Sequence, residues 1–507
     1  MQRERERERD VIEMEIVALD EYLGNIKVDF VKMDIQGSEF AALKGMEKMI
    51  ENNPKIKILL EYSPLCLEES GVNLKIFLNY LNSLNLSMNV LWEDKPMQPV
   101  TNEWLLQNCG VKKKNSHLNL FLQNIEEPYK PKIMICSRCV SDTTISDIVF
   151  NQEGVCQFCL MHDLMAKKYP LDERSDRELE ALVQKIKASG KNKRYDCVIG
   201  VSGGTDSTYM IYVAVKAGLR PLAVHFDNGW NSEIAVRNIQ NATKALNVDL
   251  ETVVADWEEF KDLQIAFLKA SVSDAEIPTD VAIHGVLHDV AAKEGIKYVF
   301  FGHSFRNEGI VPVSWTYMEG KYVNSIHKKF GHKKITSFPN ITLWTLFYYR
   351  VIKGIQCIPF VNYFKYDKLK VKKLLEEALG WRYYGGHHHE SLYTKFFQSY
   401  YLPKKFNIDK RILEYSAFIR TGLMSREEAL RELNAPYPYE EDAVDYVLGK
   451  LGLSREEFNQ IMSAPRKSFH DYPTYYPLLR FLKPFIYVGF KLGFVPEIIY
   501  FKYFYKT

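Results

Sequence analysis

The stretch YDCVIGVSGGTDSTYMIYVAVKAG, residues 195–218, decides the fold of this chain. Its apolar start predicts a buried strand, and a helical pattern begins directly behind the Ser-Gly-Gly turn. A glycine pair at a strand-to-helix junction lets the backbone approach a ligand closely. Because a helix begins there, its positive end adds to the backbone amides of the turn. The junction therefore predicts a site for an anion.

The turn spans residues 202–207, SGGTDS. No lysine follows the glycines, so it is not the Gly-x-x-x-x-Gly-Lys-Ser/Thr loop. Asp206 would be unfavourable beside a polyanion unless it binds a metal or caps the helix. A plain glycine turn with Asp206 as its cap is the alternative, but the whole string between a strand and a helix favours phosphate binding. The predicted contacts are Ser202, Gly203, Gly204, Thr205, Asp206 and Ser207.

A strand–helix series surrounds the turn and predicts α/β architecture with a parallel sheet. Strands are expected at 197–201, 221–226, 250–256 and 297–302. Open parallel sheets bind ligands at the carboxyl edge of their strands. His303 and Arg306 follow the fourth strand. An arginine there suits a developing phosphate charge, although it could equally pair with a surface acid.

These features resemble the PP-loop ATP pyrophosphatases, the fold shared by asparagine synthetase, GMP synthetase, NAD synthetase and tRNA-thiolating enzymes. The resemblance implies that the turn holds the pyrophosphate end of ATP, with Mg²⁺, and that ATP is split between its α and β phosphates. In HFDNGWNS, residues 225–232, it makes Asp227 and Asn228 candidates for nucleotide contact, with a helix cap as the alternative for Asp227. The predicted catalytic residues are Asp206, His303 and Arg306.

Two CxxC pairs, CSRC at 136–139 and CQFC at 156–159, predict a metal site. Zinc prefers four ligands in a tetrahedron, and each pair presents two thiolates. Four thiolates leave no open position, so a Zn²⁺ ion here would be structural. The predicted ligands are Cys136, Cys139, Cys156 and Cys159. The other four cysteines are scattered, and reduced thiols are typical of the cytoplasm.

Five separated motifs indicate a more specific resemblance within the PP-loop enzymes. The cysteine unit, VIGVSGGTDSTYM, GHSFRNEG, the segment 381–411 and SAFIRTGLMSREEALRELNAPYP occur in order within residues 133–507. Together they resemble the N-acetyl sugar amidotransferases of bacterial surface-polysaccharide (O-antigen) biosynthesis. His387 departs from the lysine expected at its position, and a solvent loop is the alternative for the histidine run. The implied substrate contacts are His388, His389, Glu390, Lys395 and Lys404.

The resemblance also implies a reaction and partners. The amide oxygen of an acetamido sugar, nucleotide- or lipid-linked, attacks the α phosphate of ATP, and ammonia then displaces AMP to give an acetamidino group. Gln2 rather than a cysteine follows Met1, so an N-terminal-nucleophile glutaminase is not expected. The resemblance implies that ammonia comes from separate glutaminase and cyclase-like subunits, similar to those of imidazole glycerol phosphate synthase. A tRNA-modifying PP-loop sulfur or nitrogen transferase is the alternative. The net charge of +2 weighs against a nucleic-acid partner.

The N-terminal segment carries a second resemblance. LDEYLGNIKVDFVKMDIQGSEFAALKGM, residues 19–46, is similar to the second half of FkbM-type methyltransferases, which use S-adenosylmethionine. Asp34 and Glu39 occupy acidic positions of that motif. Gly24 is the only glycine before Gly37, so the glycine loop that would hold the cofactor is missing. We expect a truncated, inactive piece.

The sequence predicts four parts along the chain. The predicted location is the cytoplasm, with the inner face of the membrane as a narrower alternative. The tail, 475–507, carries five basic residues, one acid and many aromatics, which suits peripheral membrane contact; helices covering the catalytic core are the alternative. The parts are a truncated FkbM-type piece at 1–125, a four-cysteine zinc unit at 133–172, a PP-loop domain at 173–330 and a helical, aromatic-rich region at 331–507.

Overall fold

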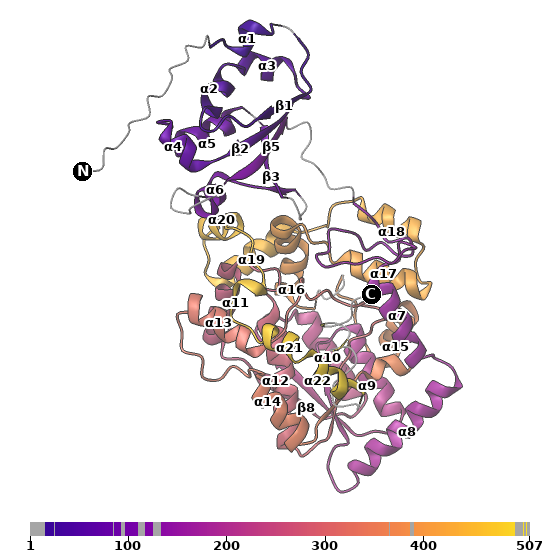
Figure 1. The fold of residues 1–507 in the computed structure, drawn as a ribbon. Helices are drawn as coiled ribbons and strands as arrows, with labels where there is room; N and C mark the ends of the chain where they lie inside the picture. The colour runs from indigo at the N-terminus through magenta and orange to yellow at the C-terminus, as the bar shows by residue number, and fades with distance from the viewer. Residues whose placement is uncertain are drawn as a thin grey trace, which may run out of the picture. The chain divides into compact units, whose positions relative to one another are not determined.

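The computed structural model describes residues 16–24, 26–84, 86–92, 97–109, 117–124, 133–364, 366–385, 390–491, 500 and 503. The chain divides into two compact units, Met1–Lys132 and Ile133–Thr507 (Figure 1). Two predicted substrate contacts, His388 and His389, lie outside the described residues.

The first unit is a mixed sheet with helices. Its strands lie in the order β1-β2-β5-β3-β4, with β1 and β2 parallel and β5 antiparallel to both β2 and β3. The strands are β1 (Phe30–Met33), β2 (Lys57–Tyr62), β3 (Leu86–Leu91), β4 (Gln98–Pro99) and β5 (Leu118–Asn124). The helices are α1 (Leu19–Tyr22), α2 (Glu39–Lys44), α3 (Glu47–Asn52), α4 (Pro64–Glu69), α5 (Leu74–Ser83) and α6 (Asn102–Asn108).

The second unit is built on a five-stranded sheet in the order β10-β9-β6-β7-β8, with every neighbouring pair parallel. The strands are β6 (Cys197–Gly200), β7 (Pro221–Asp227), β8 (Leu250–Val254), β9 (Tyr298–Phe300) and β10 (Gln356–Ile358). The chain runs outward from β6 to β8 and then returns to the other side of β6 as β9. A topological switch point therefore lies between β6 and β9, where open sheets bind ligands. The predicted parallel α/β fold is confirmed.

Helices cover both faces of this sheet because alternate strand residues point to opposite sides. Val198 lies in one buried cluster with Val286 of α12 (Ile277–Lys293), whereas Ile199 lies in another with Met210 and Ile211 of α9 (Thr205–Lys216). The helices of the second unit before residue 331 are α7 (Gln157–Lys168), α8 (Glu173–Ser189), α9 (Thr205–Lys216), α10 (Glu233–Ala245), α11 (Trp257–Ala270), α12 (Ile277–Lys293) and α13 (Gly320–Phe330).

The C-terminal part is mostly helical, but it also supplies β10 to the sheet. No helix among the described residues is long and apolar enough to cross a membrane. The elements are α14 (Leu343–Phe347), the π-helix η1 (Tyr348–Ile352), the 3-10 helix η2 (Phe360–Tyr363), α15 (Lys368–Leu379), α16 (Leu392–Phe396), the π-helix η3 (Phe397–Phe406), α17 (Arg411–Thr421), α18 (Arg426–Leu433), α19 (Glu441–Leu451), α20 (Arg455–Ser463), the 3-10 helix η4 (Phe469–Asp471), α21 (Tyr476–Phe481) and α22 (Lys483–Lys491).

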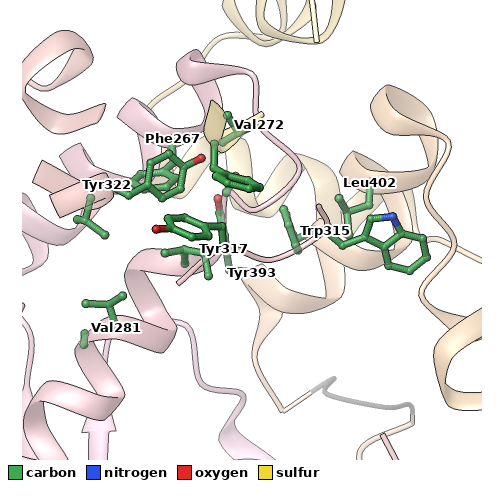
Figure 2. Packing of buried hydrophobic residues seen from close by; sticks show 14 of the residues in the cluster. Phe267, Val272, Val281, Trp315, Tyr317, Tyr322, Tyr393 and Leu402 are labelled. Atoms are coloured by element: carbon green, nitrogen blue, oxygen red, sulfur yellow. The ribbon is translucent and has the colours of Figure 1, made fainter. Parts of the chain in front are cut away.

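Buried aromatic side chains join this helical part to the sheet domain (Figure 2). Tyr322 of α13 lies edge-on to Tyr317 and to Phe267 of α11, with ring centroids 5.7 and 5.6 Å apart. Tyr393 of α16 and Leu402 of η3 belong to the same buried cluster. The first helices of the C-terminal part are thus packed into the core that flanks the sheet.

Candidate active site

The turn after β6 has the backbone that its glycines predict. Gly203 has a φ of 78°, and a Cβ at this residue would lie 2.3 Å from the carbonyl oxygen of Ala235. Gly204 is the N-cap of α9, which begins at Thr205. The turn therefore presents backbone amides and the positive end of a helix at the carboxyl edge of the sheet.

Two serine hydroxyls lie within the turn. Ser207 Oγ accepts from the backbone N–H of Ser202 at 3.2 Å, and the two hydroxyl oxygens are 3.3 Å apart. The N–H of Gly204 donates to Ser202 Oγ, also at 3.3 Å. These hydroxyls can turn toward a bound anion as additional donors.

A cavity of about 850 Å³ opens at this edge of the sheet. The turn of residues 202–207, called the phosphate turn below, lines it through every residue except Gly203, together with Asn228 after β7 and His303 after β9. His303 Nδ1 lies 2.6 Å from a carboxylate oxygen of Glu308, which orients the imidazole. Asn228 is 7% exposed, and its Oδ1 accepts from the N–H of Trp230 at 3.2 Å. The structure thus brings the turn, Asn228 and His303 to one cavity at the switch point.

His225 and Asn231 also line the cavity, and the sequence analysis did not single them out. His225 Nδ1 lies 2.9 Å from the carbonyl oxygen of Val201, which can only accept, so Nδ1 carries the proton. Nε2 is then free to accept from Asn231 Nδ2 at 3.2 Å. Both residues belong to HFDNGWNS, residues 225–232, at the end of a predicted strand. That position could have identified them as candidates from the sequence.

The segment that follows α15 closes over the phosphate turn. Trp381 Nε1 and Asn238 Nδ2 both donate to the carbonyl oxygen of Gly203, at 2.9 and 3.2 Å. A Cβ at Gly204 would come within 3.2 Å of the Tyr384 hydroxyl. Burial raises the pKa of Tyr384, and nearby carboxylates raise it further, so the phenol stays protonated and can donate.

Glu390, a predicted substrate contact, lies directly beside the turn. Its Oε1 accepts from Ser202 Oγ at 3.3 Å, and its side chain is 8% exposed. The backbone fixes this position, because Ser232 N donates to the Glu390 carbonyl oxygen at 2.8 Å and Leu392 N donates to that of Trp230 at 2.9 Å. The start of the C-terminal helical part is therefore paired with the chain that follows β7.

Lysines that the sequence analysis missed also line the cavity: Lys368, Lys372 and Lys410. Lys368 Nζ lies 3.3 Å from a carboxylate oxygen of Glu414. Burial lowers the pKa of Lys368, but the charges of Asp206 and Glu414 outweigh it, so its pKa is raised. Burial, and then the charge of Lys368, lower the pKa of Lys372. For Lys368 and Lys372 the available signal was the i, i+4 spacing, which puts them on one face of a helix.

Arg306, predicted to meet phosphate charge, is not among the described residues that line the cavity. Its guanidinium donates to the carbonyl oxygen of Asn362 at 3.2 Å and to that of Tyr169, and it lies 4.4 Å from the ring centroid of Phe305. Burial lowers its pKa to about 10. The alternative of a surface ion pair does not describe it either, because its partners are backbone carbonyls.

Three further predicted residues lie away from the cavity lining. Asp227 Oδ1 accepts from the N–H of Gly229 at 2.9 Å, so it stabilises the loop after β7. Lys395 Nζ lies 2.7 Å from Glu440, and Lys404 Nζ is 5.3 Å from the ring centroid of Tyr439. The positions of the two lysines follow from tertiary contacts with residues far along the chain.

The four predicted metal ligands come together. Their sulfurs are buried and all lie within 4.8 Å of one another. Cys156 Sγ is 3.7 Å from those of Cys139 and Cys159, and the sulfurs of Cys136 and Cys159 are 3.9 Å apart. Thiolates in a tetrahedron around one zinc ion would lie about 3.8 Å from one another. In a 4Fe–4S cluster each cysteine binds its own iron, which spreads the sulfurs further. The donor set therefore fits a single tetrahedral ion.

Two arginines join the cysteine unit to the C-terminal helices. Arg420 donates to Cys159 Sγ at 3.2 Å and to Cys139 Sγ at 3.4 Å, and Arg426 donates to two carbonyl oxygens of the first CxxC pair at 3.1 Å. Arg420 belongs to α17, which also lines the cavity through Phe418. One helix thus contacts both the cysteine unit and the cavity.

Family comparisons match three separate parts of the chain. Residues 2–87 match the methyltransferase FkbM domain, residues 196–343 match the queuosine biosynthesis protein QueC, a PP-loop family, and residues 390–484 match the C-terminal domain of LPS biosynthesis protein WbpG-like proteins. No curated protein matches the chain significantly.

Solved structures similar to the chain include the tRNA thiolase NcsA from Methanococcus maripaludis with its 4Fe–4S cluster, at 13% identity and a TM-score of 0.26, covering 64% of this chain and 99% of that one. The NH3-dependent NAD synthetase from Campylobacter jejuni, in complex with nitrate, has 15% identity and a TM-score of 0.22, covering 41% of this chain and 93% of that one. Likenesses this slight carry no argument about function. The middle of the chain, residues 196–343, is therefore similar to a PP-loop family, in agreement with its parallel sheet; an FkbM match precedes it and a WbpG-like match follows it.

Proposed function

We propose that the chain is an ATP-dependent amidotransferase of lipopolysaccharide biosynthesis, which converts the acetamido group of a sugar precursor into an acetamidino group. The observation that carries the proposal is the contact between Glu390 and Ser202. Glu390 is the first residue of the WbpG-like match, and Ser202 begins the phosphate turn. An acceptor held by the WbpG-like domain would therefore lie beside the phosphates of ATP.

The reaction needs adenylation because an amide carbonyl is a poor electrophile. The amide oxygen forms a bond to the α phosphorus of ATP, and the bond from that phosphorus to the β phosphate bridge breaks, releasing pyrophosphate. Ammonia then adds to the activated carbon, and the carbon–oxygen bond breaks to release AMP. The oxygen of the former amide leaves with AMP, and the product carries a protonated amidine. Charge develops on phosphate oxygens in the first step, where fixed donors stabilise it most.

Different residues at the cavity would carry out these steps. Amides and hydroxyls of the turn would hold the pyrophosphate, and Asp206 would hold Mg²⁺, since carboxylate oxygens are the ligands that this ion prefers. Lys368 would add positive charge for the phosphates. Asn228 would contact the nucleotide, and Glu390 would accept the proton that ammonium must lose before it attacks. Mg²⁺ when bound neutralises phosphate charge and orients the leaving group.

The cysteine unit would hold Zn²⁺ as a structural ion. Its four thiolates leave no coordination position for a substrate, and Arg420 offsets part of their negative charge. Ammonia would come from separate glutaminase and cyclase-like subunits. The tRNA-modifying alternative is less well supported, because none of the described residues that line the cavity is a cysteine that could carry sulfur.

The test is product analysis with the full chain, ATP, ammonium and a nucleotide-linked N-acetyl sugar. We expect release of pyrophosphate and AMP, and a product about one mass unit lighter, because NH replaces oxygen. The matched control is the same sugar nucleotide with a hydroxyl in place of the acetamido group, which should release neither. Adenylation of bulk tRNA, with no change in the sugar, would support the alternative and overturn the proposal.

A further inference from the structure

Two exposed apolar helical segments stand out on the second unit. The first is the continuous helix of α14 and η1, where Trp344 is 78% exposed and Val351 61%. The second comprises α21 and α22, where Phe481 is 79% exposed and Phe485 73%. Soluble monomers rarely leave such clusters open to water, so these segments mark a surface that contacts something else.

Each segment presents its apolar residues on one side. Trp344, Phe347 and Val351 are spaced i, i+3 and i+7, so they share one face of the first helix. Phe481 and Phe485 are spaced i, i+4, across the short break before Lys483. Both segments therefore have the layout of an amphipathic helix that lies along a surface.

The two segments start at the same place in the fold, the first turn of α13. Asn340, which precedes α14, donates from Nδ2 to the carbonyl oxygen of Gly320 at 3.0 Å. The N–H of Tyr475, which precedes α21, donates to a carboxylate oxygen of Glu319 at 2.9 Å. Because their starting points are anchored within two residues of each other, both segments leave the core from one site (α13, α14, α21 and α22 are labelled in Figure 1).

The sequence stretches that contain the two segments carry charge of one sign. Residues 320–366 include eight Lys or Arg and no Asp or Glu, and residues 472–491 include three Lys or Arg and no acid. Lys353 lies over the ring of Tyr348 at 5.4 Å, which keeps a cation beside the first apolar face. A chain whose net charge is only +2 therefore concentrates cations where its apolar side chains are exposed.

We propose that these two segments bind the surface of an anionic lipid bilayer, with Trp344, Val351, Phe481 and Phe485 entering the boundary between headgroups and acyl chains. Exposed aromatics next to acid-free basic stretches complement anionic headgroups, and a protein partner of mixed charge would leave those cations unpaired. No described helix is long enough to span the bilayer, so the contact is peripheral. The proposal does not depend on which reaction the cavity performs.

The test is co-sedimentation of the full chain with phosphatidylcholine vesicles, with and without about one third phosphatidylglycerol. We expect binding only to the anionic vesicles and its loss in high salt. The variant Trp344→Ser, Val351→Ser, Phe481→Ser, Phe485→Ser should bind at least about ten-fold more weakly while keeping its circular dichroism melting curve. The matched control replaces exposed apolar residues elsewhere with serine: Ile26, Leu65, Ile76 and Val254. It should bind as the unchanged chain does.

A second measurement separates lipid insertion from electrostatic adhesion. Brominated acyl chains quench tryptophan fluorescence on contact, so they should quench the unchanged chain, and Trp344→Phe should remove most of that quenching without removing binding. Absence of binding to anionic vesicles would overturn the proposal, as would equal binding by the four-serine variant. The proposal would also fail if the two segments mediated dimerisation, or bound the glutaminase partner, without binding to vesicles.

Discussion

At Gly203 the backbone takes a positive φ, and a methyl group would approach the carbonyl oxygen of Ala235 to 2.3 Å. Gly203→Ala should therefore distort the phosphate turn, at a cost of about 2 kcal/mol or more in the free energy of unfolding. We expect pyrophosphate release to fall at least about a hundred-fold. The control is Gly449→Ala, because Gly449 lies within α19 with open space around it. Steady-state kinetics and thermal melting check both variants, and near-normal turnover by Gly203→Ala would contradict the role of the turn.

Arg306 and His303 follow the same strand, yet the structure gives them different surroundings. Arg306 donates to two backbone carbonyls away from the cavity, so Arg306→Met should lower the free energy of unfolding by about 2–4 kcal/mol. The protein that remains folded should keep its KM for ATP. His303 lines the cavity, so His303→Gln should lower kcat with little change in melting temperature. The reverse pattern, with kcat lost in Arg306→Met at unchanged stability, would contradict this assignment.

These residues also show which parts of the site could be predicted from the sequence. Strand ends of a parallel sheet meet at one edge, so periodicity brought the turn and His303 to the same place, whereas Asn228 was a candidate through the PP-loop resemblance. The direction of Arg306 depends on Tyr169 and Asn362, which are far from it in the chain, and no local pattern encodes that contact. The cavity lysines Lys368 and Lys372 come from α15, a helix whose placement only the tertiary fold decides.

Among the elements, α17 connects the cysteine unit to the cavity. Arg420 donates to two cysteine sulfurs, and Phe418, two residues earlier, lines the cavity. Arg420→Met should therefore weaken metal retention, because the negative charge of the thiolates loses its partner, and it should lower turnover as well. Arg431→Met, on the exposed surface of α18, is the control.

Metal content and melting temperature measure this prediction. The unchanged chain should hold one equivalent of zinc, and chelation should lower both its melting temperature and its pyrophosphate release. Full turnover by a metal-free chain, or by Arg420→Met after dialysis against a chelator, would contradict the coupling through α17.

Strands with an apolar run were predictable whatever their length, and the three-residue β9 lies within the strand expected at 297–302. The strands at 197–201 and 221–226 correspond to β6 and β7, since each is a continuous apolar run. β10 spans three residues before Pro359 inside an otherwise helical region, so its pairing with β9 could not be read from a local pattern. The sequence SEFAALKGMEKMIENN, residues 38–53, predicts a single helix, but the structure divides it into α2 and α3 around Gly45, a weak helix former.

At the scale of the whole molecule, the two compact units suggest separate folding. A chain that begins at Ile133 keeps the sheet, the cavity and the cysteine unit, so it should retain the melting transition and the ATP turnover of the full chain. A chain that begins at residue 173 is the matched control, because it lacks the cysteines and leaves Arg420 without its sulfur partners. Calorimetry and pyrophosphate release compare them. Loss of turnover in the Ile133 chain would contradict independence of the units.

The central claim, that an amide oxygen takes the adenylyl group at the turn after β6, has a direct test in isotope transfer. An N-acetyl sugar nucleotide carrying ¹⁸O in its acetamido carbonyl is incubated with the full chain, ATP and ammonium, and the AMP is analysed by mass spectrometry. We predict that the label appears in the phosphate of AMP, in amounts equal to the acetamidino product. Unlabelled AMP, or an amidine formed without AMP, would contradict the account.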